Sequence, residues 1–505
     1  MRREQDNHEK HFLSSMNLKE KWANTTCRRD NLTMFLKSLG LVHIVFLVFC
    51  SLSNAGTYYI SPTGNDKATG LSVTESWNTI AKANASLKPG DTAYILAGTY
   101  SDQIRPSVSG ISGERITYSA YNGQIVILSA STCVNLQNRS YISIIGFTAN
   151  GGKRFLVTGD SSAEGNAHYN IIKDNALSNL TGWGAIYLSN NCTYNEISGN
   201  TISACFGDAI LLQINCNYNT IYGNVVHDTG EHSELCIRGA ISSTDHPDAQ
   251  SNYNIVKDNI FYNSGGTTDG AVMVLLNSNY NLFEGNKFYE TPAGLGNAKY
   301  NGLKINNSTG NIVRYNEFSN LDGFGALIYT NLWSGLAFPA EGNVIHNNVF
   351  YNCEVAHQQF DEGAILLYRY DGAKPISNNI IINNIISDSK YFAITLAAVG
   401  GSSYLLNNVL ANNTLYNNAM TIRRLGTNLT AAQAMASFPN EFKSLSGWNP
   451  EFIDPAHQDF RLSTTSPCRD AGTLYSGLQI PYQGSQPDIG FDEYLAIPMD
   501  FRIKG

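Results

Sequence analysis

A pair of asparagines five residues apart recurs nine times between Asn170 and Asn413, and this repeat constrains the fold more than any other feature. Successive pairs begin 25, 24, 35, 27, 30, 32, 36 and 29 residues apart, so the period changes only through insertions. A self-similar period of this length is typical of a solenoid, in which each unit packs on its neighbours. The pairs are Asn170/Asn175, Asn195/Asn200, Asn219/Asn224, Asn254/Asn259, Asn281/Asn286, Asn311/Asn316, Asn343/Asn348, Asn379/Asn384 and Asn408/Asn413.

One unit, Tyr169–Asn190, indicates what each repeat folds into. Strands are predicted at 170–173, 176–178 and 184–188, with polar turns or loops between them. Three short strands and no helix in one period favour a parallel β-helix over a horseshoe or a helical repeat. Asparagine tolerates a left-handed backbone in turns, and its side-chain amide can bond the equivalent amide one coil above or below. The repeated asparagines therefore predict a hydrogen-bonded ladder.

The repeat array resembles the right-handed parallel β-helix family typified by pectate lyases and related polysaccharide-active proteins. Thr57–Tyr100 resembles the amino-terminal cap of secreted polysaccharide lyases, while Asn449–Gly472 and Pro487–Tyr494 resemble tails that close secreted β-helix proteins. The resemblance implies an all-β fold, a right-handed parallel β-helix built as a three-strand solenoid of about twelve coils. It also implies a polysaccharide substrate. Because many activities share this scaffold, the chemistry has to be argued from side chains.

Four segments are predicted along the chain. Residues 1–55 form an amino-terminal extension with a signal peptide, residues 56–100 a cap with an amphipathic helix, residues 101–428 the β-helix, and residues 429–505 a carboxy-terminal cap and tail. A solenoid grows along one axis, so 505 residues need not be divided among several cores.

The signal peptide is predicted from the apolar run Leu39–Phe49, which precedes Ser53-Asn54-Ala55, a site of the kind that signal peptidase accepts. Cleavage after Ala55 would deliver the protein to a secreted, cell-surface or periplasmic location, and Met34 is an alternative start. The run is short for a transmembrane span, and an uncleaved anchor is the competing interpretation.

Charge and composition exclude some partners. Only 15% of the residues are charged, and removal of residues 1–55 leaves 25 basic against 36 acidic residues. No basic run remains, which argues against nucleic acid and anionic membranes as partners. We expect a monomer that acts on a polysaccharide.

Cysteines Cys192 and Cys216 each precede a ladder asparagine by three residues, so they should stack in adjacent coils about 4.8 Å apart. That distance permits a disulfide. The same column continues as Ser251, Ser278 and Ser308, and a simple column of small side chains is an equal alternative.

The outward side chains of the third strand form the candidate functional face. We take Ile186, Ile210, Ile241, Val272, Leu327, Ile365 and Ile394 as inward, which makes their neighbours outward. One outward row then reads Tyr187, Leu211, Ser242, Met273, Lys304, Ile328, Leu366 and Thr395. The row two residues further on reads Ser189, Gln213, Thr244, Leu275, Asn306, Thr330 and Tyr368, and the strand entrance carries Trp183, Gly207, Arg238, Asp269, Tyr300, Phe324, Glu362 and Tyr391. The longest insertions flank the same strand, so loops are expected to wall a groove.

Carboxylates at the strand entrance could serve as general acid and base in glycoside hydrolysis: Asp361, Glu362 and Asp269. Asp269 and Glu362 stand three coils apart, about 14 Å, which exceeds the roughly 6.5–9.5 Å of inverting pairs. A pair of Glu362 or Asp361 with a loop acid fits better. Solvated edge carboxylates are the structural alternative.

Lys304, with Arg238 and Arg369, offers a different chemistry. The family resemblance implies that a Lys or Arg removes the proton beside a uronate carboxylate, while a cation or Ca²⁺ neutralises that carboxylate. A single Lys that points outward in mid-strand suits the role of base if its neighbours favour the neutral amine. The alternatives are an ordinary solvated lysine and an ion pair between Arg238 and Asp269.

The remaining candidates concern metal and substrate binding. Asp245 and Asp248, with loop carbonyls, are candidate ligands for Ca²⁺, which accepts irregular oxygen cages. The sequence names no certain cofactor. Aromatic rings can stack on the apolar faces of sugars, and the candidate substrate-binding residues are Trp183, Tyr187, Tyr300, Asn306, Trp333, Tyr368 and Arg369, with Phe324 and Tyr370 on the same face.

The leading interpretation is a secreted enzyme that cleaves a polysaccharide, and the family resemblance implies β-elimination ahead of hydrolysis. A glycoside hydrolase that uses Glu362 and Asp361 is the second candidate. A non-catalytic surface protein that only binds glycans is the third.

Overall fold

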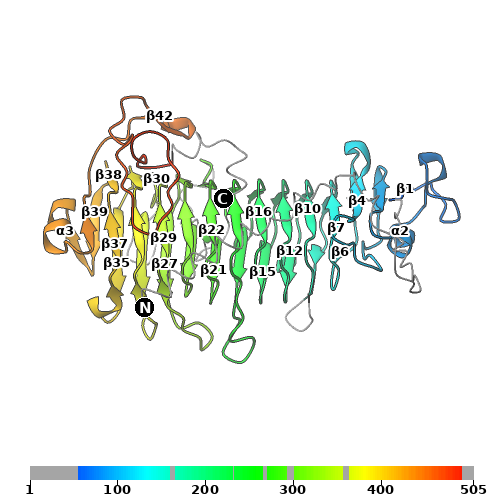
Figure 1. Ribbon diagram of the computed structural model, residues 1–505, viewed down its shortest axis with the longest axis horizontal. Coiled ribbons are helices and arrows are strands. Elements are labelled where there is room, and N and C mark those ends of the chain that lie inside the picture. Colours follow the sequence, from blue (N-terminus) through cyan, green and yellow to red (C-terminus); the bar gives the residue numbers. More distant parts are fainter. Residues whose placement is uncertain are drawn as a thin grey trace, which may run out of the picture. The chain divides into compact units, whose positions relative to one another are not determined.

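The computed structural model describes residues 55–159, 165–230, 232–264, 270–292, 301–355 and 363–491. All of them belong to one compact unit. Three long β-sheets run along this unit, and almost every strand pairs in parallel with the equivalent strand of the next coil (Figure 1). From β4 to β39 the chain visits the three long sheets in the order A, B, C, and the fold is a right-handed parallel β-helix, as predicted.

Sheet A has 14 strands. They are β1 (Thr57–Ile60), β2 (Thr92–Ile95), β4 (Ile116–Ala120), β7 (Ile142–Ile145), β10 (Ile171–Lys173), β13 (Glu196–Ser198), β16 (Thr220–Tyr222), β19 (Ile255–Lys257), β22 (Leu282–Glu284), β25 (Ile312–Arg314), β29 (Val344–His346), β33 (Ile380–Ile382), β37 (Val409–Ala411) and β41 (Phe442–Lys443).

Sheet B has 12 strands. They are β3 (Gly98–Tyr100), β5 (Val126–Leu128), β8 (Thr148–Asn150), β11 (Ala176–Ser178), β14 (Thr201–Ser203), β17 (Val225–His227), β20 (Ile260–Tyr262), β23 (Lys287–Tyr289), β26 (Glu317–Ser319), β30 (Val349–Tyr351), β34 (Ile385–Ser387) and β38 (Thr414–Tyr416).

Sheet C also has 12 strands, of which β40 alone among the described strands of this sheet pairs antiparallel, with β39. They are β6 (Thr132–Asn135), β9 (Arg154–Val157), β12 (Gly184–Ser189), β15 (Asp208–Gln213), β18 (Leu235–Arg238), β21 (Gly270–Leu275), β24 (Asn301–Asn306), β27 (Ala326–Thr330), β31 (Ile365–Arg369), β35 (Phe392–Ala398), β39 (Met420–Arg424) and β40 (Thr427–Leu429). The strands of sheet C are mostly longer than those of sheets A and B.

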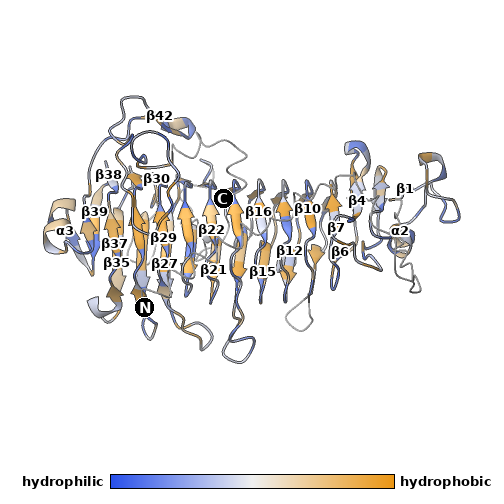
Figure 2. Cartoon of the chain, viewed as in Figure 1, coloured by the Kyte–Doolittle hydropathy of each residue, from blue (hydrophilic) through white to orange (hydrophobic). Residues whose placement is uncertain are grey.

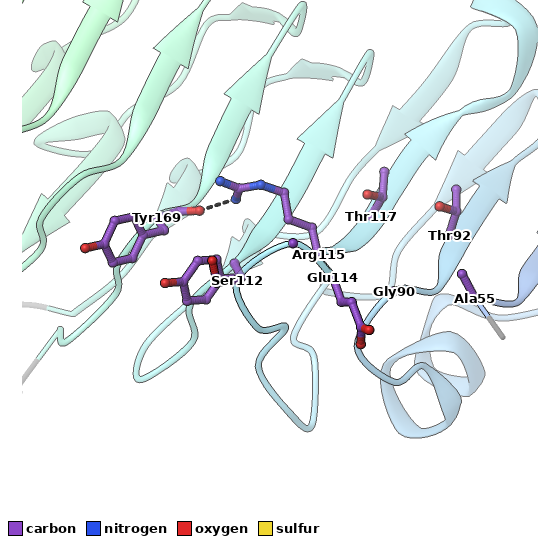
Figure 3. A pocket seen from close by; sticks show the side chains of 10 residues that line it. Ala55, Gly90, Thr92, Ser112, Glu114, Arg115, Thr117 and Tyr169 are labelled. Atoms are coloured by element: carbon purple, nitrogen blue, oxygen red, sulfur yellow. Dashed lines mark hydrogen bonds between the residues drawn. The ribbon is translucent and has the colours of Figure 1, made fainter. Parts of the chain in front are cut away.

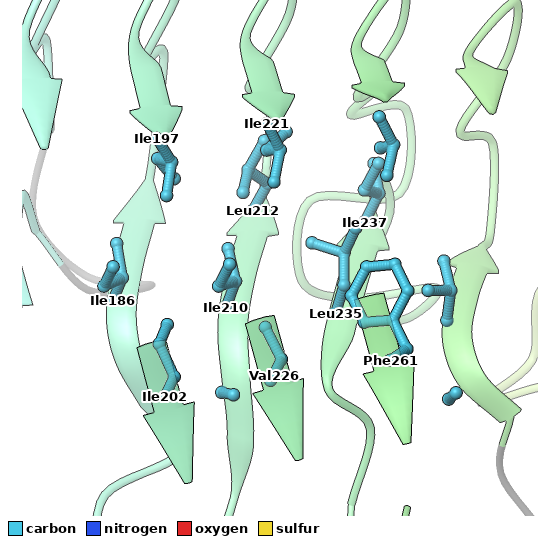
Figure 4. Packing of buried hydrophobic residues seen from close by; sticks show 14 of the residues in the cluster. Ile186, Ile197, Ile202, Ile210, Leu212, Ile221, Val226, Leu235, Ile237 and Phe261 are labelled. Atoms are coloured by element: carbon cyan, nitrogen blue, oxygen red, sulfur yellow. The ribbon is translucent and has the colours of Figure 1, made fainter. Parts of the chain in front are cut away.

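The core lies between the three sheets. Each strand contributes inward aliphatic or aromatic side chains, such as Ile197 from sheet A, Ile202 from sheet B and Ile186 from sheet C (Figure 4). In sheet B four phenylalanines, Phe261, Phe288, Phe318 and Phe350, stack in successive coils at 4.5–5.2 Å between ring centroids. The hydropathy colouring shows the same division, with apolar residues along the strands and polar residues in most of the turns (Figure 2).

The asparagine ladders are confirmed. In each ladder the backbone N–H and the side-chain amide of one asparagine both donate to the side-chain oxygen of the asparagine in the next coil, as from Asn259 to Asn286, both at 3.0 Å. The pattern continues through every pair named above, up to Asn408 and Asn413. The buried ladders therefore satisfy the turns on both sides of sheet A.

The prediction that ladder asparagines adopt a left-handed backbone is wrong. Positive φ belongs to the residue before each of them, for example Tyr169 at 57° and Asp174 at 55°. The ladder asparagine is the residue that turns its side chain into the coil, so the sharp reversal falls one position earlier.

The residues that directly precede the first asparagine of successive pairs form a second column. Six tyrosines, from Tyr141 to Tyr280, stack ring on ring along the turn between sheets C and A, with centroids 4.9–5.3 Å apart. We call this column the tyrosine ladder, and its members are Tyr141, Tyr169, Tyr194, Tyr218, Tyr253 and Tyr280.

Both ends of the β-helix are covered. The expected cap helix is α2 (Ile80–Ser86), and it buries Ile80 and Ala83, with Trp77 and Leu87 buried on either side of it. At the other end lie α3 (Ala431–Ser437) and the hairpin of β42 (Phe452–Asp454) with β43 (Asp459–Leu462). Three two-residue strands, β28 (Ala340–Glu341), β32 (Ile376–Ser377) and β36 (Leu405–Leu406), form a small additional sheet.

The carboxy-terminal tail packs on the outside of the coils. Phe460 and Ile489 join a buried cluster with Val349, Ile382 and Ile385, which point outward from sheets A and B. In Figure 1 the tail, in orange and red, passes over the part of the molecule that holds β30. Within the described ranges no helix is long and apolar enough to cross a membrane.

Cys192 and Cys216 carry free, buried thiols. The column continues as predicted, because the Cys216 N–H donates to Ser251 Oγ at 3.3 Å and the Ser278 N–H to Ser308 Oγ at 3.2 Å. The interpretation as a column of small side chains is therefore the correct one.

Candidate functional site

The pairing of sheet C fixes which side chains point outward. One outward row reads Tyr187, Leu211, Cys236, Met273, Lys304, Leu327, Leu366, Thr395 and Arg423. The row two residues further along each strand reads Ser189, Gln213, Arg238, Leu275, Asn306, Tyr329, Tyr368 and Ala397.

The predicted orientation was wrong in two coils. In β18 the inward residues are Leu235 and Ile237, so Ile241 lies beyond the strand. In β27 Leu327 points outward, because Leu303 pairs with Ala326 and shifts the alternation by one residue. Insertions around these strands displaced the alignment. Two predicted outward residues, Ser242 and Ile328, thus leave the row.

Arg238 moves as a consequence. It lies in the second outward row between Gln213 and Leu275, rather than at the strand entrance. Its guanidinium donates to the carbonyls of Ala240 and Ile241, at 3.2 and 2.9 Å. Its visible role is to hold the loop that follows β18.

The outward face of the earlier coils is apolar and covered. Tyr187, Leu211, Cys236, Met273 and Leu275 form a buried cluster outside the sheet. The loop after β27 folds back over this cluster and packs Trp333, Leu336 and Phe338 against it. Trp333, predicted to bind substrate from the groove wall, is here part of the cover.

The polar centre of the face lies beside this cover. Lys304 stands between Met273 and Leu327 and is only 7% exposed, and its Nζ lies 5.5 Å from the centre of the Tyr329 ring. Asn306, 1% exposed, neighbours Tyr329 across the strands, and neither its side-chain oxygen nor its nitrogen has a hydrogen-bond partner. A buried amide without hydrogen-bond partners costs free energy, which makes Asn306 unusual among the side chains of this face.

Aromatic rings border this centre. Tyr329 stacks on Tyr368 of the next coil at 5.7 Å between centroids, and Tyr368 approaches Tyr370, which is 48% exposed, at 6.5 Å. Burial raises the pKa of Tyr329 to about 12, helped by Tyr368 and Tyr370. The phenol of Tyr329 therefore stays protonated at neutral pH and can donate a hydrogen bond.

Arg369 belongs to the scaffold. It is 4% exposed, its Nε and one terminal nitrogen donate to the Ala373 carbonyl at 3.1 and 2.7 Å, and another nitrogen donates to the Val399 carbonyl. Its guanidinium also lies 3.7 Å from the centre of the Tyr404 ring. These bonds engage the whole fork, and we leave Arg369 out of the candidate site.

Buried acids lie in the turns that lead into sheet C. Glu234 is fully buried with no hydrogen-bond partner for either oxygen, and Glu290 is 3% exposed with one oxygen unpartnered. Burial raises the pKa of Glu234 well above its usual range, and the nearby Glu290 and Asp228 add to the rise. Burial likewise raises the pKa of Glu290 to about 9, with a further contribution from Asp322. The Glu290 carboxyl group is therefore neutral near pH 7.

The calcium prediction finds no support in the described ranges, where no three His, Cys, Asp or Glu side chains converge as a metal site. Asp245 contacts His246 at 3.6 Å, and its N–H donates to Ser242 Oγ at 3.0 Å. A Ca²⁺ site formed by Asp245 and Asp248 with loop carbonyls stays a prediction.

Four predicted site residues lie outside the described residues: Asp269, Tyr300, Asp361 and Glu362. Two others, Trp183 and Tyr187, are described. Trp183 is 57% exposed in the turn before β12, while Tyr187 is 5% exposed, receives a hydrogen bond from the Gln213 amide and lies under the Arg154 guanidinium.

A separate cavity of about 630 Å³ lies near the amino-terminal end (Figure 3). It is lined by Arg115, Tyr141 and Tyr169, with Thr92 and Thr117 from the outer side of sheet A. Arg115 donates to the Tyr169 carbonyl and lies 5.7 Å from the Tyr141 ring centre, so it caps the tyrosine ladder. This cavity lies beside sheet A and is separate from the outward face of sheet C that carries Lys304.

Known proteins share this architecture. Residues 184–372 match the family model described as "Right handed beta helix region". This segment contains β12 to β31 and therefore Lys304, Asn306 and Tyr329. The fold is thus a right-handed parallel β-helix both by its topology and by the family match.

Individual relatives are distant. An uncharacterized protein, YwoF of Bacillus subtilis (strain 168), is 28% identical over 110 residues, which are 20% of this chain and 23% of that protein. The match therefore spans about a quarter of the relative's length. The solved structures that resemble the chain include polysaccharide lyases and a glycoside hydrolase, all at low identity.

Three of these structures illustrate the range. XylC in complex with xylose is 13% identical, with a TM-score of 0.49 over 79% of this chain and 87% of that one. The pectate lyase Pel9A is 16% identical, with a TM-score of 0.46 over 87% of this chain and 97% of that one. The PL6 family alginate lyase AlyGC is 14% identical, with a TM-score of 0.49 over 85% of this chain and 60% of that one.

Proposed function

We propose that this protein cleaves a polysaccharide by β-elimination on the outward face of sheet C, with Lys304 as the base. The observation that carries the proposal is the grouping of Lys304, the unpartnered amide of Asn306 and the Tyr329 phenol on adjoining strands of one face. On a face whose neighbouring outward residues are Met273, Leu275 and Leu327, these three groups stand out as a polar centre.

The reaction needs three tasks from the chain. The neutral amine of Lys304 takes the proton from the carbon beside a uronate carboxyl group, the electron pair of that C–H bond forms the new C=C bond, and the glycosidic C–O bond breaks. The leaving oxygen takes up a proton, for which the Tyr329 phenol is the nearest described donor on the face. Asn306 can donate its amide N–H to the carboxylate and accept a sugar hydroxyl.

The test is product chemistry. Mature protein is incubated with polygalacturonate, alginate and xylan while the ultraviolet absorbance of unsaturated ends and the number of reducing ends are followed. We expect unsaturated ends from an acidic polymer. Reducing ends without unsaturation would instead indicate the hydrolase that uses Glu362 and Asp361, and absence of cleavage with retained binding would indicate the glycan-binding protein.

A variant pair sharpens the assignment. Lys304→Ala should lower the rate by about 10²–10⁴, the usual contribution of general acid–base catalysis. Lys173→Ala is the matched control, because Lys173 points outward from sheet A and its side chain is 44% exposed. Glu362→Gln should mainly weaken binding under elimination. If it abolished turnover while Lys304→Ala did not, hydrolysis would replace elimination.

We further propose that the protein is a secreted monomer. Of the predicted signal segment, residues 1–55, all but Ala55 lie outside the described residues, and Gly56 is the predicted first residue of the mature chain. Expression from Met34 in a secreting host, followed by amino-terminal sequencing of the exported protein, tests this. Recovery of Leu39–Phe49 in a membrane fraction would support the anchor instead.

A further inference from the structure

Three aromatic rings gather at the edge of sheet C, several coils away from Lys304. Trp183, Phe206 and His232 occupy the turns that lead into β12, β15 and β18, three successive strands. The Trp183 and His232 ring centroids are 4.6 Å apart, and those of Phe206 and His232 are 6.4 Å apart. We call these three residues the aromatic patch.

The backbone beside the patch is tightly stacked, and both large rings of the patch are exposed. A Cβ atom at Gly207 would lie 2.6 Å from the Gly182 carbonyl oxygen and 2.7 Å from Trp183 Cα, so there is no space for a side chain between the coils at that position. Trp183 remains 57% exposed and Phe206 47% exposed.

This arrangement differs from the tyrosine ladder. There the rings are nearly parallel, at 4–11° to one another, and cover each other's faces. In the patch the planes are tilted by 50° and 71°, which leaves ring surface uncovered. In the tyrosine ladder, stacking on neighbouring rings explains why the rings lie at the surface. The patch lacks such stacking, and an exposed tryptophan beside an exposed phenylalanine is typical of a binding surface.

A cation stands next to the patch. The Cγ atom of Arg154 would be 2.9 Å from a Cβ at Gly182, the residue before Trp183, and its guanidinium lies 4.8 Å from the Tyr187 ring centre. Arg154 Nε is buried without a hydrogen-bond partner. The rings of the patch can therefore contact the apolar face of a sugar, and Arg154 can donate to a carboxylate. Together they fit an acidic sugar.

The patch lies on the same sheet as Lys304, and the covered cluster of Tyr187, Leu211, Cys236 and Met273 lies between the two places. Tyr187 and Lys304 share one outward row of sheet C with three strands between them, a separation of about 19 Å along the β-helix. An extended chain of several sugar units can contact both places at once. Binding at the patch would then raise the effective concentration of the polymer at Lys304.

We propose that Trp183, Phe206 and His232, with Arg154, form a second binding site that holds a distant segment of an acidic polysaccharide. This inference rests on the proposed function for its substrate class, and it can be tested by binding alone. It predicts that long chains depend on the patch and that short oligosaccharides cleaved at Lys304 do not.

The experiment is affinity electrophoresis of the mature protein in native gels that contain polygalacturonate, alginate or neutral xylan. Wild type should be retarded by at least one acidic polymer, and Trp183→Ala/Phe206→Ala should weaken that retardation about tenfold, equivalent to about 1.4 kcal/mol. Arg154→Gln should weaken retardation by the acidic polymers. Trp183→Phe should restore most of the binding lost in Trp183→Ala, with thermal melts confirming that each variant is folded.

Trp448→Ala is the matched control, because Trp448 is 45% exposed in the carboxy-terminal region. Lys304→Ala should bind like wild type while losing cleavage, which separates the two proposals. If wild type cleaves nothing but binds through the patch, the patch stands and the elimination proposal fails. The patch proposal is overturned if no acidic polymer retards wild type, if the double variant binds as wild type does, if Trp448→Ala weakens binding equally, or if xylan is preferred.

Discussion

The turns on both sides of sheet A differ from the turns that lead into sheet C. Both kinds of turn connect one strand to the next, but their sequence patterns are opposite. The turns around sheet A repeat one residue at one position, and the side chains of Asn286 and its equivalents bond from coil to coil. The turns into sheet C vary in length and sequence, and they hold the buried carboxyl groups of Glu234 and Glu290 and the exposed rings of Trp183 and Phe206. Repetition stabilises the scaffold, and variation leaves room for function.

The largest expected effect concerns the buried acids of the sheet C edge. Because the folded pKa of Glu290 is raised to about 9 from 4.5, its contribution to stability is fully present below about pH 4.5 and is lost as the pH rises toward about 9. Glu290→Gln removes this titration. The stability of wild type relative to the variant should therefore fall by on the order of 1 kcal/mol per pH unit between about pH 5 and 8.

Urea unfolding of both proteins at several pH values measures this difference. A constant difference between wild type and Glu290→Gln across the range would show that the carboxyl group titrates normally. The turns into sheet C would then not differ from the turns around sheet A by holding an acid with a raised pKa.

The second effect concerns close packing at the entrance to β24. A Cβ at Gly302 would lie 2.1 Å from the Gly325 carbonyl oxygen and 2.7 Å from the Phe318 ring, so Gly302→Ala must displace a neighbouring coil. We expect a loss of roughly 1–3 kcal/mol in the free energy of unfolding. Gly447→Ala is the control, because its Cβ would meet a single atom at 3.6 Å, within ordinary contact. Equal melting temperatures for the two variants would contradict the close stacking.

The smallest difference concerns the asparagine ladder. Asn286→Leu removes side-chain bonds to both neighbouring coils and leaves their groups unpaired, at a cost of roughly 1–3 kcal/mol. Asn413→Leu at the last rung should cost less, since the Asn413 amide donates only to the Ile381 carbonyl among the described residues. Thermal melts compare the two. No loss at Asn286 would mean that the ladder adds nothing to stability.

The ladder edges could be predicted from the sequence because their signal is periodic. The asparagine spacing predicted the coil, the three strands and the column of Cys216 and Ser251. The tyrosine ladder was equally visible, since a tyrosine precedes Asn170, Asn195 and three further asparagines, but it was missed. Asparagine was assigned the left-handed backbone that the preceding residue actually adopts, because turn propensity alone does not distinguish adjacent positions.

The sheet C edge could be predicted only in part. The outward positions of Lys304, Asn306 and Tyr368 were correct, because no insertion interrupts β24 or β31 between the inward residues and these positions. Arg238 and Leu327 were misplaced, because insertions hide where each strand begins. Tyr329 was missed through the same shift. The cover formed by Trp333 and Phe338 joins coils that are far apart in sequence, and no local pattern indicates such a contact.

Hydrogen exchange with and without polygalacturonate tests the central contrast most directly. The account predicts that the polymer slows exchange in β24, β27 and β31 and in the turns that carry Trp183 and Phe206, and leaves the turns around sheet A unchanged. Protection confined to the tyrosine ladder and the outer face of sheet A would contradict it, because the polymer would then bind at the regular turns and not at the variable turns into sheet C.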